Sequence, residues 1–178
     1  MIEIREADPT SDVLRPIVEA HFAHSESAGP AESNHTMSAE SLAGPGIRFC
    51  AIYDDQQALG CGALKLLPDG TAEVKSVHIL AQARGRGLAR VMMTHLADLA
   101  RAEGVEALVL ETGAEHLPEY DAARKLYEAL GYSYCRPIFG YSDDPNSAFM
   151  RLALEPRSQK PQEGCSGPLA QLDRAADF

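Results

Sequence analysis

The 178-residue chain lacks the long apolar segments of membrane proteins and of secreted precursors. No uninterrupted apolar run approaches the length that spans a bilayer, and residues 1–6 lack the apolar core of a secretion signal. We therefore expect a cytoplasmic protein with no membrane partner. The length suits one domain with a hydrophobic core, and contents of 45% hydrophobic and 24% charged residues are typical of a globular protein.

Basic residues are also scarce. The chain has 16 Lys and Arg residues against 26 Asp and Glu residues, which leaves a formal net charge of -10. Because binding to nucleic acid needs clustered Lys and Arg to neutralise phosphates, we expect no nucleic-acid partner. The acidic balance is compatible with a cationic substrate and weakly favours an amine.

Cysteine and histidine show none of the spacings that hold metals. The four cysteines have no C-x-x-C pattern, and three of them fall in apolar, strand-like runs, so we expect buried thiols in place of disulfides. The cysteines are Cys50, Cys61, Cys135 and Cys165. No pair among the six histidines has the spacing of a motif such as H-E-x-x-H, so no metal site is predicted.

The most informative segment places two glycines between a strand and a helix. Residues 72–80 alternate apolar and polar side chains with one slip, which predicts a strand with a bulge. Apolar residues then recur at helical spacing from Leu88 to Leu99. Glycine permits a tight turn, and the first N–H groups of a helix lack intrahelical partners, so an anion can bind there. This predicted anion cradle consists of Arg84, Gly85, Arg86, Gly87, Leu88 and Ala89.

Several classes of protein contain an anion cradle of this kind. A dinucleotide-binding fold would need a third glycine at the position of Arg90, where a side chain obstructs helix packing. A nucleotide-hydrolase P-loop is excluded because the string G-x-x-x-x-G-K-[ST] is absent. The pyrophosphate site of a coenzyme A-binding protein and a glycine-rich loop with solvated arginines both remain open at this point.

The surrounding motifs resemble the GNAT superfamily of N-acetyltransferases. Its acetyl-CoA signature, [QR]-x-x-G-x-[GA], is matched by Arg84, Gly87 and Ala89. Residues 110–113 and 123–132 look like the superfamily's fifth strand and the helix after it. Several motifs in the right order are far more specific than one glycine string.

Further segments are similar to a small bacterial, YsnE-like subgroup of these enzymes. They are residues 30–35, 59–65, 137–141 and 143–150. The similarity spans roughly residues 1–155, which we expect to form one acetyltransferase domain. Residues 156–178 hold three prolines, three glutamines and few large apolar side chains, which predicts a disordered tail.

The resemblance implies the GNAT fold, a mixed α/β architecture. It has a central, mostly antiparallel sheet of about seven strands, splayed between the fourth and fifth strands and flanked by about four helices. Periodicity along the chain predicts strands over residues 1–7, 47–53, 58–67, 71–80, 107–110, 132–135 and 148–154. It predicts helices over residues 12–22, 38–42, 87–104 and 119–130.

The resemblance also implies acetyl-CoA as the co-substrate. Its pyrophosphate would bind the cradle, and its thioester would lie against the strand at Val77, His78 and Ile79. Tyr127 falls on the tyrosine that protonates the coenzyme A thiolate in many members, although its helical spacing would also suit a core residue. Glu73 occupies the position of the glutamate that deprotonates the amine, with Glu111 as a rival base.

Substrate contacts are implied for six residues in the same way. They are Glu32, Ser33, His35, Glu111, Phe139 and Tyr141. One departure concerns Tyr120, seven residues before Tyr127, where many members carry an asparagine that contacts the cofactor. That contact is not carried over to this chain.

The activity implied is transfer of an acetyl group from acetyl-CoA to a primary amine of a small molecule, by direct attack in a ternary complex. Two alternatives remain: a non-catalytic module that binds or senses acyl-CoA, and an enzyme that acts on a protein N-terminus or lysine. A homodimer is compatible with the resemblance, but no interface is visible in the sequence.

Overall fold

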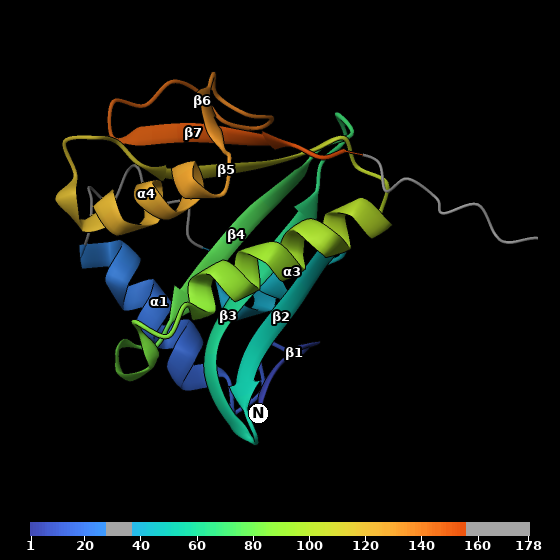
Figure 1. Ribbon diagram of the computed structural model, residues 1–178, viewed down its shortest axis with the longest axis vertical. Coiled ribbons are helices and arrows are strands. Elements are labelled where there is room, and N and C mark those ends of the chain that lie inside the picture. The colour runs from blue at the N-terminus through green and yellow to red at the C-terminus, as the bar shows by residue number, and fades with distance from the viewer. Residues whose placement is uncertain (28–36, 156–178) are drawn as a thin grey trace, which may run out of the picture.

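The computed structural model describes residues 1–27 and 37–155, which form one seven-stranded sheet with helices on both faces (Figure 1). The first half contains β1 (Ile2–Glu6), α1 (Arg15–Ser27), α2 (Ala39–Leu42), β2 (Ile47–Asp54), β3 (Gln57–Leu66), β4 (Ala72–Ile79) and the short 3₁₀ helix η2 (Ala81–Ala83). The second half contains α3 (Leu88–Ala102), β5 (Ala107–Gly113), the 3₁₀ helix η3 (Pro118–Tyr120), α4 (Asp121–Ala129), β6 (Ser133–Cys135) and β7 (Ser147–Ala153).

The strand order is β1-β2-β3-β4-β5-β7-β6, and every neighbouring pair is antiparallel except β4 and β5. Those two strands are parallel and pair only at Ala72 with Leu108 and at Glu73 with Val109. Beyond Glu73 they separate, and the sheet opens. This mixed, mostly antiparallel sheet, splayed between its fourth and fifth strands, confirms the predicted GNAT fold.

A bulge in β4 accompanies the opening. The register between β3 and β4 shifts between Cys61 and Ala63, and Ser76 on β4 adopts a positive φ of 54°. A bulge inserts an extra residue and bends its strand, so β4 can turn away from β5. The slip in the alternation of residues 72–80 therefore marked a real irregularity.

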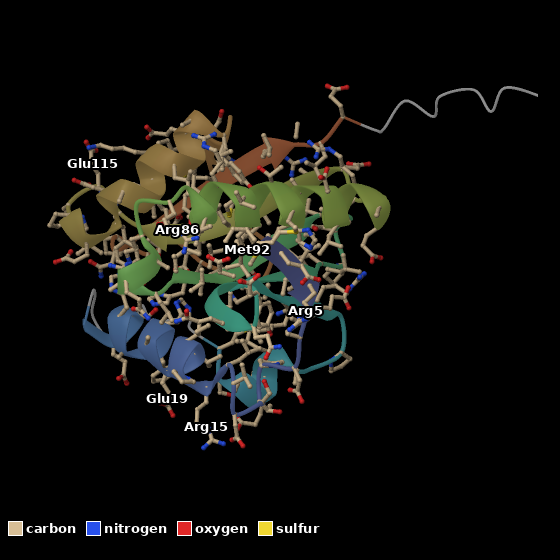
Figure 2. All side chains as sticks on the ribbon, turned by 60° about the horizontal axis from the view of Figure 1, so that its bottom comes forward. Arg5, Arg15, Glu19, Arg86, Met92 and Glu115 are labelled. Carbon is tan, nitrogen blue, oxygen red and sulfur yellow. The ribbon has the colours of Figure 1, made fainter. Side chains whose placement is uncertain are left out.

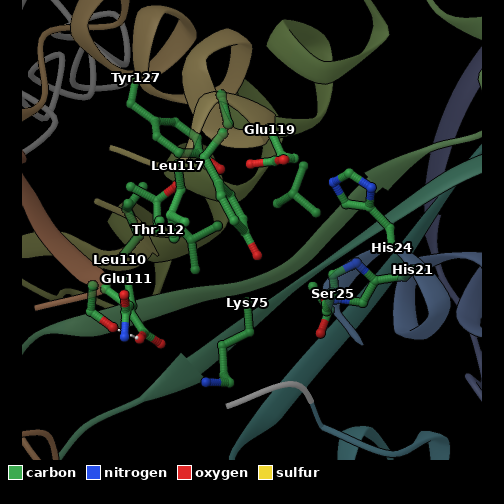
Figure 3. A pocket seen from close by; sticks show the side chains of 18 of the residues that line it. His21, His24, Ser25, Lys75, Leu110, Glu111, Thr112, Leu117, Glu119 and Tyr127 are labelled. Atoms are coloured by element: carbon green, nitrogen blue, oxygen red, sulfur yellow. Dashed lines mark hydrogen bonds between the residues drawn. The ribbon is translucent and has the colours of Figure 1, made fainter. Parts of the chain in front are cut away.

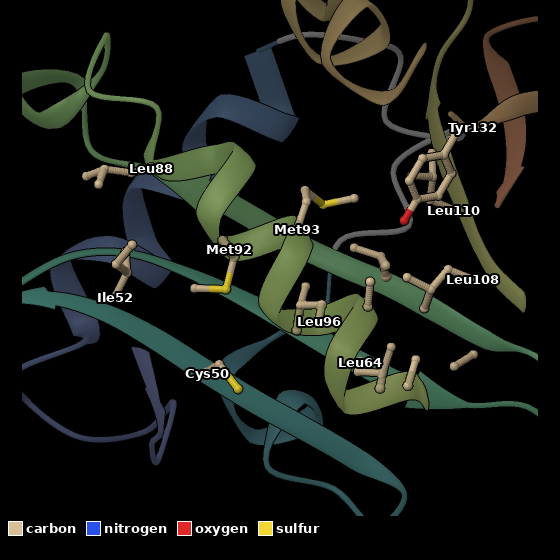
Figure 4. Packing of buried hydrophobic residues seen from close by; sticks show 14 of the residues in the cluster. Cys50, Ile52, Leu64, Leu88, Met92, Met93, Leu96, Leu108, Leu110 and Tyr132 are labelled. Carbon is tan, nitrogen blue, oxygen red and sulfur yellow. The ribbon is translucent and has the colours of Figure 1, made fainter. Parts of the chain in front are cut away.

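Two hydrophobic clusters lie on opposite faces of the sheet because successive strand side chains alternate. From β2, Cys50 and Ile52 face α3, whereas Phe49 and Ala51 face α1. Beneath α3, a Cβ added to Gly62 would lie 2.9 Å from Met92 Cγ, so this glycine lets the helix approach the strand. Figure 4 shows the side chains of α3 packed against the sheet.

Charged side chains cover the outside of these layers. Figure 2 shows Arg15 and Glu19 extending outward from α1, while Met92 lies between α3 and the sheet. Within the described residues, no helix has the length and apolar character needed to cross a membrane.

The prediction of buried thiols is confirmed for two of the four cysteines. Cys50 and Cys61 are buried, and desolvation raises the pKa of the two thiols to about 11 and about 12. The prediction is wrong for Cys135, which is exposed because it lies on β6, an edge strand whose three residues are all exposed. Cys165 lies outside the described residues.

Two other predictions also fall outside the described residues. They concern the substrate contacts of Glu32, Ser33 and His35, and the tail of residues 156–178.

Candidate active site

A cavity lies where β4 and β5 separate (Figure 3). Its walls come from α1, β4, β5, η3, α4 and the start of β7, so it joins segments that are far apart in the sequence. The predicted site residues that line it are Glu73, Val77, Glu111 and Tyr127. The splay of the sheet therefore gathers four of the side chains that the sequence singled out.

The predicted cradle is a tight turn that leads into α3. Gly85 and Gly87 have φ values of 76° and 75°, in the left-handed region that strongly favours glycine. A Cβ added to either residue would meet no atom within 4 Å, so the requirement is conformational and the space beside the turn is open. Gly87 is the N-cap of α3, and no side chain of the described residues caps this helix end. Its first N–H groups therefore lack a side-chain acceptor, which suits them to an anion.

The two arginines of the turn are held by the protein itself. Arg84 Nε donates to the carbonyl oxygen of Ile79 at 3.1 Å and fastens the turn to the end of β4. Arg86 forms an ion pair with Asp54, with Nη2 and Oδ2 2.7 Å apart. The side chains of Leu88 and Ala89 pack into or against the core below α3. Those two positions can reach a ligand through the backbone only.

The three strand positions predicted to face the thioester differ in their surroundings. Val77 lines the cavity and packs partly against the cluster below α3. Ile79 belongs to that same cluster. The His78 side chain points to the opposite face, where its ring lies near two histidines of α1.

Tyr127 packs against the hydrophobic core and also lines the cavity. Its ring packs against the cluster below α3 and lies 5.8 Å from the ring of Tyr132. Within the described part of the chain, no hydrogen bond engages its hydroxyl. Desolvation raises the pKa of Tyr127 to about 12, so the hydroxyl keeps its proton at neutral pH and can donate it.

Glu73 forms a hydrogen-bonded network with Lys75 and Tyr141. Its side chain is 3% exposed, and its Oε1 accepts hydrogen bonds from Lys75 Nζ at 2.9 Å and from the Tyr141 hydroxyl at 2.5 Å. Lys75 Nζ also donates to the Tyr141 hydroxyl at 2.7 Å. Burial, followed by the hydrogen bond to Glu73, raises the pKa of Tyr141. Tyr141 thus contacts Glu73 and Lys75 and is not among the described residues that line the cavity.

Sequence reasoning missed Lys75, although a signal was available. Residues i and i+2 of a strand share a face, so Lys75 had to lie beside Glu73. By contrast, the structure does not bring Phe139 to the cavity, and its side chain is 52% exposed.

Carboxylates outnumber cations on the described cavity wall. Glu111 accepts a hydrogen bond from the Ser147 hydroxyl at 2.5 Å, and Glu119 lies across the cavity from it (Figure 3). With Glu73 they make three carboxylates, against the single ammonium group of Lys75 among the described lining residues. The wall therefore favours a positively charged ligand.

A row of rings forms the side of the cavity near α1, and the sequence did not reveal it. The ring centroids of His21 and His78 are 5.6 Å apart, those of His24 and His78 are 6.1 Å apart, and those of His24 and Tyr120 are 6.3 Å apart. Desolvation is the largest cause that lowers the pKa of both His21 and His78 to about 4, so both rings are neutral at neutral pH. The described residues contain no cluster of side chains that could hold a metal ion.

Tyr120 and the loop around it are positioned from two sides. A Cβ added to Gly113 would lie 2.1 Å from the Tyr120 ring, so only glycine lets the ring lie over the end of β5. Arg124, buried on α4, donates to the carbonyl oxygens of Gly113 at 2.6 Å, Ala114 at 2.7 Å and Leu117 at 3.3 Å. No sequence pattern predicted this contact of Arg124, because the backbone carbonyl groups that it binds are the same in every residue type.

The splayed sheet, the uncapped helix behind a glycine turn and the acidic cavity agree with a comparison against protein families. The Acetyltransferase (GNAT) family matches residues 14–132. The chain belongs to this family. As a GNAT protein it is an acyltransferase. The resemblance to the GNAT superfamily seen in the sequence is confirmed.

Relatives of this GNAT chain cover most of its length. It is 36% identical over 153 residues to the uncharacterized N-acetyltransferase YsnE of Bacillus subtilis, and this match covers 86% of this chain and 100% of that protein. It is 34% identical over 155 residues to the IAA acetyltransferase of Azospirillum brasilense, covering 86% and 98% of the two chains. A crystal structure of a protein from Klebsiella pneumoniae, described as an acyl-CoA N-acyltransferase, matches with a TM-score of 0.70 and 30% identity over 87% of this chain and 99% of that one.

Proposed function

We propose that the chain transfers an acetyl group from acetyl-CoA to a primary amine of a small molecule, by direct attack in a ternary complex. The observation that carries the proposal is the acidic cavity at the splay of β4 and β5, with the Tyr127 hydroxyl on its wall. Three carboxylates on that wall suit a cationic acceptor.

The residues of the cradle and of β4 fit the donor. The backbone N–H groups after Gly87 have no side-chain acceptor in the described part of the chain and can bind a pyrophosphate. Beyond Glu73, β4 lacks its parallel partner, so its backbone is available to an extended ligand that lies in the gap. Arg84 and Arg86 hold the turn in place, and Gly85 gives it the left-handed conformation that it needs. Val77 lies where the gap opens into the cavity.

The chemistry needs a polarised carbonyl, an unprotonated amine and a proton for the thiolate. In this proposal, backbone N–H groups near Val77 face the carbonyl oxygen. Glu73 receives a proton from the amine, directly or through water, and Tyr127 donates its hydroxyl proton to the departing thiolate. A covalent cysteine intermediate is disfavoured, because the thiols of Cys50 and Cys61 are buried with raised pKa values.

The test measures the release of coenzyme A with a panel of primary amines and, in a separate assay, with IAA, for which the Azospirillum relative is named. We expect release with at least one amine and a loss of kcat in Tyr127→Phe, which keeps the ring but removes the donor. Glu73→Gln removes the carboxylate that would accept the amine proton, so kcat should fall. Binding of coenzyme A without turnover on any amine would favour a binding module. Acetylation of peptides but not of free amines would indicate a protein acceptor.

A further inference from the structure

The chain places an amine of its own inside the cavity. Lys75 lines it, with a side chain that is only 11% exposed, and its Nζ lies 2.9 Å from the carboxylate of Glu73. The same Lys75 Nζ donates a hydrogen bond to the Tyr141 hydroxyl at 2.7 Å, and it lies 5.5 Å from the centroid of the Tyr141 ring. Among the described lining residues, no other side chain carries a primary amine. Lys75 therefore occupies the surroundings that an acceptor ammonium would need.

Its place on the backbone brings this amine to the gap in the sheet. Glu73 is the last residue of β4 that pairs with β5, and Lys75 follows two residues later, on the same strand face. The next residue, Ser76, forms the bulge with its φ of 54°. An acyl group in the gap would thus lie beside the strand that carries Lys75. Holding the two reactants on one scaffold replaces a bimolecular encounter by an intramolecular one.

We propose that Lys75 is a site of self-acetylation, at which the chain transfers an acetyl group from acetyl-CoA to its own Nζ. This inference rests on the proposed function, because it uses the same donor and the same Tyr127.

The step balances without any further reactant. The Lys75 ammonium loses one proton to Glu73 and becomes a nucleophile. Its lone pair forms a bond to the carbonyl carbon, and the bond between that carbon and sulfur breaks. The thiolate takes the proton of the Tyr127 hydroxyl, and a second proton from the lysine nitrogen returns to Tyr127 through water. The products are an amide at Lys75, coenzyme A and one proton released from Glu73 to solvent.

An exposed lysine elsewhere in the chain distinguishes acetylation inside the cavity from acetylation in solution. The chain has four lysines, which are Lys65, Lys75, Lys125 and Lys160. Lys125 is exposed on α4, whereas Lys75 is nearly buried. Uncatalysed acetylation by a thioester in solution should reach the exposed amine first, because it depends on collision from outside. Acetylation inside the cavity should modify Lys75 faster than Lys125.

The experiment incubates the full chain with acetyl-CoA and no added amine, followed by tryptic mass mapping. Acetylation removes the lysine charge and blocks cleavage, so modified Lys75 yields the uncut peptide from Leu66 to Arg84 with the mass of one added acetyl group. We expect the rate at Lys75 to exceed that at Lys125 by more than about tenfold. The rate should not depend on protein concentration, as an intramolecular step requires.

Two variants and a turnover assay complete the test. Tyr127→Phe should slow labelling of Lys75 and leave Lys125 unchanged, with thermal unfolding in coenzyme A as the check on folding. Lys75→Arg keeps a cation beside Glu73 and should abolish the labelled peptide. Labelling of Lys125 with none at Lys75, in a chain that turns over free amines, would refute the inference and leave the proposed function intact. Labelling at Lys75 without turnover of any amine would support the inference and refute the acceptor that we propose. With neither reaction, both fail.

Discussion

Acidification should destabilise the chain through the buried imidazole of His78. Its side chain is 7% exposed, and desolvation, helped by the charges of Arg84 and His24, lowers its pKa from 6.5 to about 4. The folded state therefore takes up this proton later than the unfolded state does. Each unit of difference is worth about 1.36 kcal/mol, so the shift corresponds to at most about 3 kcal/mol.

The sign of the effect follows from proton linkage. Above pH 6.5 the imidazole is neutral in both states, and its contribution is fully present. As the pH falls from about 6.5 to about 4, the unfolded state binds the proton and the folded state does not, so the free energy of unfolding decreases. Below about pH 4 both states are protonated, and this component stops changing. His21, whose pKa is also lowered to about 4, should add a loss of the same sign.

The assay is denaturant unfolding of the wild-type chain and of His78→Gln at several pH values between 7 and 4. Glutamine does not titrate, and the carboxylates that titrate in this range are common to both proteins, so they cancel in the difference. We expect the stability advantage of the wild type to shrink by up to about 3 kcal/mol across the range. An NMR titration of the His78 ring should place its midpoint near pH 4. A constant difference between the two proteins, or a midpoint near 6.5, would refute the reasoning.

Three substitutions test how the site is built. Gly87→Ala should cost about 1–2 kcal/mol, because alanine is strained at a φ of 75°, and should also weaken coenzyme A binding in a calorimetric titration. Gly113→Ala places a Cβ against the Tyr120 ring and should cost about 1–3 kcal/mol, with a raised KM for the amine; an unchanged KM would exclude Tyr120 from the acceptor site. Arg124→Met should lower the free energy of unfolding by about 3 kcal/mol in urea, because buried carbonyl groups lose their donor; a loss below about 0.5 kcal/mol would contradict this role of Arg124.

Local signals predicted most of the fold. The stripe of apolar residues in α3 and the alternation in β4 are set by side chains within a few positions of one another, so periodicity was enough to find both elements. The same holds for the turn before α3, where Gly85 and Gly87 adopt the left-handed conformation that the glycines indicated. Boundaries were less accurate. The helix expected at residues 12–22 is α1, Arg15–Ser27, and the strand expected at 107–110 continues to Gly113.

The hydrogen-bond network of the candidate site was harder to predict because its partners are far apart in the chain. Tyr141 reaches Glu73 across 68 positions, and the histidines of α1 meet His78 across more than 50. Family resemblance pointed to Tyr141 as a substrate contact, and the structure shows its hydroxyl hydrogen-bonded to Glu73 and Lys75, outside the described cavity lining. Only the folded sheet brings β4 next to the loop before β7.

The sequence by itself determined the structure of the segment that we assign to the donor. A glycine turn, an amphipathic helix and a strand are local features, and their chemistry depends mainly on backbone conformation, which neighbouring residues dictate. The tertiary structure alone decided the cavity wall that we assign to the acceptor, where Lys75 pairs with Glu73 and Tyr141, and where His21 and His78 are kept neutral by burial. Those properties arise from desolvation and from contacts between distant segments, and neither exists until the sheet has formed.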